Sequence, residues 1–88
     1  DIDCGFTAGA RFVLIKRTDN YTSTAHWFMY DSARGIVSGN DPYLKLTGGQ
    51  EVTSTDYIDP LNAGFTVTSS APSGMNGDDG TFMFLAIA

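Results

Sequence analysis

The chain begins its regular structure with two strongly apolar segments separated by a polar one. Residues 11–17 and 25–31 carry large side chains at both odd and even positions, which is typical of strands buried on two faces. Residues 18–24 between them are turn-forming and polar. This spacing of strand, loop and strand predicts a β-hairpin, with 11–17 as a central strand.

The last nine residues, 80–88, are apolar almost throughout. They predict a strand buried on both faces, because a segment this short falls well below the ~20 apolar residues that a membrane-spanning helix needs. We expect it to lie in the core or in a contact with another copy of the chain. We also expect 11–17 and 80–88 to lie near the middle of their sheets and next to each other.

The remaining pattern is one of short strands divided by turns rich in Gly, Pro, Asn, Asp and Ser. Residues 65–69 alternate cleanly, and residues 43–46 and 57–60 are shorter apolar segments. No segment shows the periodicity of a helix. Six or seven short strands at this spacing predict an all-β fold, an antiparallel β-sandwich or jelly-roll-like arrangement.

Residues 1–88 are long enough for a single β-sandwich module. A domain this small buries only ~60–65% of its unfolded surface and is marginally stable alone, so we expect the C-terminal piece of a longer chain or a chain with a partner. The side chains expected to form one continuous core are Phe12, Leu14, Trp27, Phe65, Phe82 and Phe84.

The charge of the chain restricts its partners. Ten acidic residues against five basic ones give a net charge of −5. This balance argues against nucleic acid, which requires a basic face, and against docking on an anionic membrane. Cys4 is the single cysteine, so neither an internal disulfide nor a cysteine-based zinc site can form within the chain. We interpret it as a small hydrophobic side chain, and the alternative is an intermolecular disulfide across a symmetry axis.

Candidate catalytic residues are few. His26 is the only histidine, and it could be combined with Asp31 and Ser32 into a nucleophilic triad. No nucleophile motif surrounds any serine, and no phosphate-binding loop is present. We therefore interpret His26 as a core or rim histidine and expect neither an enzyme nor a cofactor.

One loop has some features of a calcium site. Asn76, Asp78 and Asp79 offer oxygen ligands on a glycine-containing loop. Their spacing differs from that of an EF-hand, and a tight hairpin turn explains an Asp-Gly pair equally well. We expect this loop to lack a full ligand set, and we therefore expect that folding does not depend on calcium.

Exposed aromatic side chains are a second candidate for binding. Tyr43 and Tyr57 lie in short strands beside loops, where their rings could stack on sugars while nearby Asp and Asn side chains accept hydroxyl hydrogen bonds. The alternative is that such aromatic rings fill the core with their polar tips satisfied.

Four segments resemble, in the same order, a module common in structural proteins of tailed phages. They are GFTAGARFVLIKRTD at 5–19, WFMYDSARG at 27–35, GFTV at 64–67 and GTFMFLAIA at 80–88. The resemblance implies a tail-fibre-like virion module, located in the virion or outside the cell, with other virion proteins and a host-surface glycan as partners. It implies no catalytic residues.

Two classes of function follow. The first is a phage virion structural module that assembles as a homo-oligomer, a trimer or a fibre, and contributes to host attachment. An apolar final strand must be covered, so we expect Phe84, Leu85 and Ile87 at or next to the contact between subunits. The second is a carbohydrate-binding module of a larger secreted or viral protein.

Overall fold

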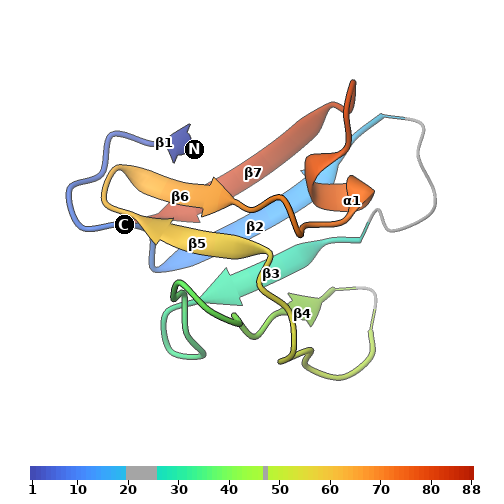
Figure 1. The fold of residues 1–88 in the computed structure, drawn as a ribbon, viewed down its shortest axis with the longest axis horizontal. Helices are drawn as coiled ribbons and strands as arrows, with labels where there is room; N and C mark the ends of the chain where they lie inside the picture. The colour runs from blue at the N-terminus through green and yellow to red at the C-terminus, as the bar shows by residue number, and fades with distance from the viewer. Residues whose placement is uncertain (20–25, 47) are drawn as a thin grey trace.

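A computed structural model describes residues 1–19, 26–46 and 48–88. Two antiparallel sheets pack face to face (Figure 1), which confirms the predicted all-β sandwich. The elements in chain order are β1 (Ile2–Asp3), β2 (Phe12–Arg17), β3 (Phe28–Asp31), β4 (Leu44–Lys45), β5 (Ile58–Leu61), β6 (Gly64–Val67), α1 (Ser73–Asn76) and β7 (Phe82–Ile87).

One sheet has three strands in the order β1-β6-β5, and the other has four in the order β4-β3-β2-β7. β2 is central, as predicted, and pairs antiparallel with β3 so that Leu14 lies opposite Met29. This pairing confirms the predicted hairpin. Residues 20–25 of its connecting loop lie outside the described part of the chain.

The predicted neighbourhood of the first long strand and the last one is also confirmed. β7 pairs antiparallel with β2 over six positions, from Phe12 opposite Ile87 to Arg17 opposite Phe82. The predicted central position of β7 is wrong, because β7 forms the edge of its sheet. Burial on both faces is wrong within one chain too, since Leu85 is 53% exposed.

The core lies between the sheets but uses a different face of β2 from the one predicted. Val13, Ile15 and Arg17 point inward and are buried, whereas Phe12 and Leu14 lie half-buried on the outer face. Because side chains alternate between the two faces along a strand, an assignment that is wrong by one residue exchanges all the inward residues for the outward ones. The buried apolar side chains are Val13, Ile15, Phe28, Tyr30, Tyr43, Ile58, Phe65 and Met75.

Of the other predicted core residues, Phe65 is buried, with 1% of its surface exposed. Trp27 and Phe82 are only half-buried. Phe84 is 46% exposed, although its ring still meets the Phe65 ring edge-on at 5.4 Å. Phe84 has the inward phase of β7, but β7 is an edge strand and leaves one side of this ring open.

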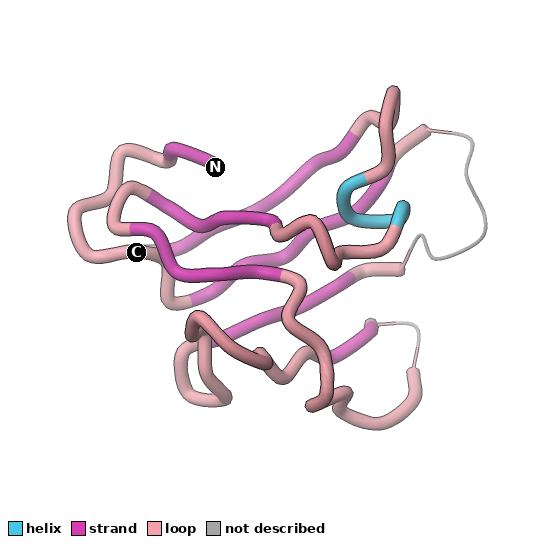
Figure 2. Tube along the Cα trace, viewed as in Figure 1, coloured by secondary structure: helices cyan, strands magenta, loops and turns pink. Residues whose placement is uncertain are grey.

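A single helical turn, α1, was not predicted from the sequence (Figure 2). Four residues are too few to show helical periodicity, so tertiary contacts must hold the turn in place. Arg17 donates a hydrogen bond to the Ser73 carbonyl at 2.9 Å and pairs with Asp19 at 2.6 Å. Met75 is buried, with its sulfur 3.9 Å from the Tyr30 hydroxyl.

The short strand β1 also escaped prediction. Ile2 lies opposite Phe65 and Asp3 opposite Gly64. The approach is so close that a Cβ atom on Gly64 would lie 2.1 Å from the Ile2 carbonyl oxygen. Glycine is therefore required at this position for β1 to join the sheet.

The corrected core predicts different costs for two phenylalanine truncations. Phe65→Ala should lower the free energy of unfolding by about 3–5 kcal/mol, because it removes a large side chain that is only 1% exposed. Phe12→Ala, on the half-buried outer face, should cost clearly less. Urea denaturation followed by tryptophan fluorescence measures both, and equal losses would show that the assigned inner face is wrong.

Candidate functional site

Tyr43 does not occupy the exposed position predicted for a sugar-binding residue. It is 5% exposed, and its ring centre lies 5.2 Å from that of Phe28, 5.6 Å from Tyr30 and 5.8 Å from Tyr57. Burial, and then the neighbouring Tyr57, raise the pKa of the Tyr43 hydroxyl. Tyr43 is thus the centre of a buried aromatic cluster, and only Tyr57 of the predicted pair is partly accessible.

The loop at Asn76–Gly80, which was considered as a calcium site, has the geometry of a turn. Gly80 donates its N–H to the Gly77 carbonyl at 3.2 Å, and Asp79 has a φ of 59°. The Asn76 amide donates to the Thr68 carbonyl at 3.2 Å. Asp78 and Asp79 both point into solvent. The segment is therefore a tight turn, although it joins α1 to β7 and is not the turn of a β-hairpin.

The three residues of the possible nucleophilic triad, His26, Asp31 and Ser32, contact other residues. Asp31 forms an ion pair with Arg34, which also pairs with Glu51 at 2.8 Å. The His26 ring meets Phe28 edge-on at 5.9 Å. Ser32 donates its backbone N–H to the Arg11 carbonyl at 2.8 Å. Asp31 therefore anchors the connection that follows β3.

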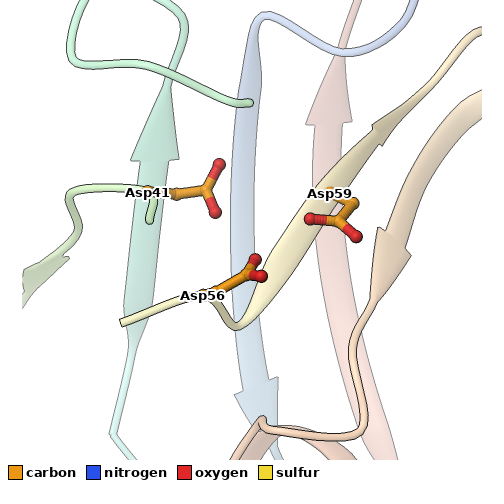
Figure 3. A group of neighbouring side chains, drawn as sticks. All are labelled: Asp41, Asp56 and Asp59. Carbon is orange, nitrogen blue, oxygen red and sulfur yellow. The ribbon is translucent and has the colours of Figure 1, made fainter. Parts of the chain in front are cut away.

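Three carboxylates that the sequence analysis did not connect meet beside β5. Asp41 lies in the connection between β3 and β4, Asp56 precedes β5, and Asp59 lies on β5. Their side chains converge on one space (Figure 3), and one oxygen from each lies within 4.8 Å of the other two. In the described part of the chain this is the one group of three or more Asp, Glu, His or Cys side chains so placed. We call it the acidic cluster.

The backbone holds the acidic cluster from both sides. Asp41 is completely buried and accepts a hydrogen bond from the Val37 N–H at 2.6 Å. Its own N–H donates to the Thr55 carbonyl at 2.9 Å. Tyr43 and Val52 form a bridge nearby, with both hydrogen bonds at 3.0 Å. The β3–β4 connection is therefore fastened to the segment that leads into β5.

The polar atoms of this region are not satisfied by the protein alone. Among the described residues, four buried side-chain atoms have no hydrogen-bond partner. All four belong to the β3–β4 connection, to the segment that leads into β5 or to β5 itself, and they are Asp41 Oδ1, Thr55 Oγ1, Asp56 Oδ1 and Asp59 Oδ1. Buried polar atoms without a partner are rare and costly. Their concentration here marks the region as a candidate site.

Electrostatics point to the same place. Burial raises the pKa of Asp41 to about 6; the Val37 N–H works against this rise, and the charges of Asp56 and Asp59 add to it. Burial also raises the pKa of Asp59, and its hydrogen bond and charge interaction with Asp56 raise it further. Without a compensating positive charge, neighbouring carboxylates resist being ionised together.

A second candidate site lies at the opposite edge of the sandwich. Residues of β7 with the outward phase, Met83, Leu85 and Ile87, are each about half exposed. On the inner side, an apolar groove of about 100 Å³ opens between the sheets. Ile2 and Phe65 line it from the three-stranded sheet, and Phe82 and Phe84 line it from β7.

The fold and these two sites define a small β-sandwich domain with one acidic edge and one apolar edge. The chain belongs to a family described as a domain of unknown function (DUF7483), whose model matches residues 2–88. No curated protein and no solved structure matches the chain. Across the described residues, no helix has the length and apolar character required to cross a membrane.

The raised pKa of Asp41 predicts a pH dependence of stability in buffer containing a chelator. Between the ordinary pKa of 3.8 and the folded value of about 6, the native state binds more protons than the unfolded state, so this contribution to stability is lost as pH rises through the window. Asp41→Asn keeps an oxygen to accept from Val37 and should remove that loss.

The measurement is the free energy of unfolding of both proteins from pH 4 to pH 7. Wild type should lose stability relative to Asp41→Asn as pH rises, and Asp78→Asn, which alters an exposed aspartate, should follow wild type. A difference between wild type and Asp41→Asn that stays constant over this range would contradict the assignment.

Proposed function

We propose that this domain is a structural module of a phage virion, tail-fibre-like, that assembles with copies of itself along β7. The observation that carries the proposal is the state of β7. Its sequence, FMFLAI, has no charged residue and no proline, and within the described residues it pairs with β2 alone. One backbone edge of an apolar six-residue strand is therefore open.

The face beside this edge is also apolar. Residues opposite each other in an antiparallel pair point to the same side of the sheet, and Phe12 lies opposite Ile87, and Leu14 opposite Leu85. The outer face of β2 and β7 is thus apolar around these two pairs, with Lys16 opposite Met83 at one end, and no strand of the three-stranded sheet covers it. Apolar surface of this kind commonly marks an interaction site.

Edge strands of proteins that stay monomeric are usually protected by charges, proline, bulges or a covering segment. β7 has no charge or proline in its sequence. Further copies of the chain can supply both missing partners, one copy by pairing along the edge and another by covering Leu85 and Ile87. Phe84 has the opposite phase and would line the apolar groove beside such a contact.

The place of the module in a virion is supported by the resemblance of its four sequence segments to tailed-phage structural proteins. In that setting the domain assembles as a trimer or a fibre, meets other virion proteins, and presents its loops to the host surface, in the virion or outside the cell. The carbohydrate-binding alternative is weaker, because Tyr43, half of its proposed aromatic pair, is 5% exposed.

The proposal predicts that charge on the outer face of β7 separates the subunits. Wild type should elute as an oligomer, and Leu85→Lys or Ile87→Lys should reduce the mass to that of one chain while the fold persists. The reason is that both side chains are about half exposed in one chain, so a lysine there reaches water in the monomer but is buried in the contact. Size-exclusion chromatography with light scattering gives the mass, and circular dichroism reports the fold.

Val37→Lys is the matched control, because Val37 is 48% exposed in a loop away from β7 and its replacement should leave the mass unchanged. A wild-type protein that is monomeric at high concentration would overturn the proposed assembly. A monomer that also binds glycans would favour the carbohydrate-binding alternative.

A further inference from the structure

We propose that Asp41, Asp56 and Asp59 form a calcium-binding site that ties the two sheets together at the β5 edge. This site is separate from the loop at Asn76–Gly80, and it is independent of the assembly proposed for β7. It assigns a ligand to a cluster that the proposed virion role does not use.

The first support is the chemistry and spacing of the ligands. Three carboxylates supply oxygen atoms only, which is the donor set of hard cations such as Ca²⁺ and Mg²⁺. One oxygen from each lies within 4.8 Å of the others. Two opposite ligands of one Ca²⁺ ion are about 4.6–5.2 Å apart, at twice the usual Ca–O distance, so three oxygens of this spread can share such an ion.

The choice of calcium over magnesium follows from the number of carboxylates. Mg²⁺ keeps several water molecules and is usually held by one or two carboxylates in a strict octahedron. Ca²⁺ accepts six to eight oxygens in a flexible arrangement. The acidic cluster offers three carboxylates from two separate segments of the chain, and the remaining positions are open to water or to neighbouring oxygens.

The second support is independent of the clustering. Asp41 is 0% exposed, and while its Oδ2 accepts from Val37, its Oδ1 is buried without a partner on a side chain directed into the cluster (Figure 3). A carboxylate oxygen can only accept, so it needs a hydrogen-bond donor or a cation. Asp56 Oδ1 and Asp59 Oδ1 are also buried without a partner, although the side chains of these two residues are only half-buried.

A bound Ca²⁺ would act on the fold as well as on the charge. Asp41 belongs to a connection of the four-stranded sheet and Asp59 to an edge strand of the three-stranded sheet. An ion held by both joins the sheets at the edge opposite β7. The cost of crowding three acidic groups is then offset by the ion's two positive charges.

The test begins with metal-free wild-type protein. Calcium titration by calorimetry should show one site per chain, and calcium at a hundredfold excess over the dissociation constant should raise the melting midpoint by about 10–20 °C. Magnesium should bind more weakly. Terbium, a luminescent substitute for calcium, should be excited through the neighbouring Tyr30, whose hydroxyl interacts electrostatically with Asp41.

Asp41→Asn and Asp59→Asn test whether the stability difference between variant and wild type changes sign when calcium is added. In chelator each variant should be at least as stable as wild type, because one of three crowded acids has been removed. In calcium the order should reverse, since wild type alone gains the full midpoint shift. Asp78→Asn is the matched control and should keep the wild-type response. A purely structural role for these aspartates would not reverse the order.

Three results would overturn the proposal. One is a wild-type protein whose midpoint and calorimetric signal do not respond to millimolar calcium, in which case protons and water satisfy the cluster. Another is a calcium response that persists in both Asp41→Asn and Asp59→Asn, or disappears in Asp78→Asn. Magnesium binding as tight as calcium binding would overturn the choice of ion. None of these results depends on whether the chain forms oligomers.

Discussion

The whole arrangement depends on β2, which pairs with β3 along one edge and with β7 along the other. Its inward residues, Val13 and Ile15, are buried against the three-stranded sheet, while Phe12 and Leu14 face outward. A strand with large apolar side chains on both faces needs cover on both, and a sandwich of one chain supplies only one. The uncovered face of the four-stranded sheet follows directly from this choice.

The sequence predicted what depends on short-range pattern. The hairpin of β2 and β3 and the burial of Phe65 could be anticipated, because runs of strand-forming residues and turn residues are local features. The pairing of β2 with β7 is long-range, and it was expected because these two segments are the most apolar in the chain. The inner face of β2 could not, because both of its faces are apolar and its two charged residues, Lys16 and Arg17, lie on opposite faces and so do not set the phase. Tyr43 was misplaced for a related reason, since the contacts that bury its ring come from residues distant in the chain.

The acidic cluster could not be predicted from the sequence either, because it depends on contacts between segments that are distant in the chain. Asp56 and Asp59 are close in sequence, but Asp41 joins them only because Thr55 and Val52 pair with the segment around it. Nothing in the local pattern marks Asp41 as buried. The two open edges of the sandwich thus differ in chemistry: β5 carries carboxylates with unpartnered oxygens, and β7 carries apolar side chains. Changes at one edge need not disturb the other, so the proposed ion binding and the proposed assembly could vary separately.

The tight contact at Gly64 gives the molecule an internal reporter. The Cys4 sulfur lies 3.0 Å from where a Cβ of Gly64 would be, and this thiol is the only one in the chain. It is half-buried as long as β1 stays on β6. Two residues of strand hold few hydrogen bonds, so β1, like the equally short β4, is easily released by local opening. The rate at which a thiol reagent modifies Cys4 therefore measures how often the N-terminal strand leaves the sheet, without any label being introduced.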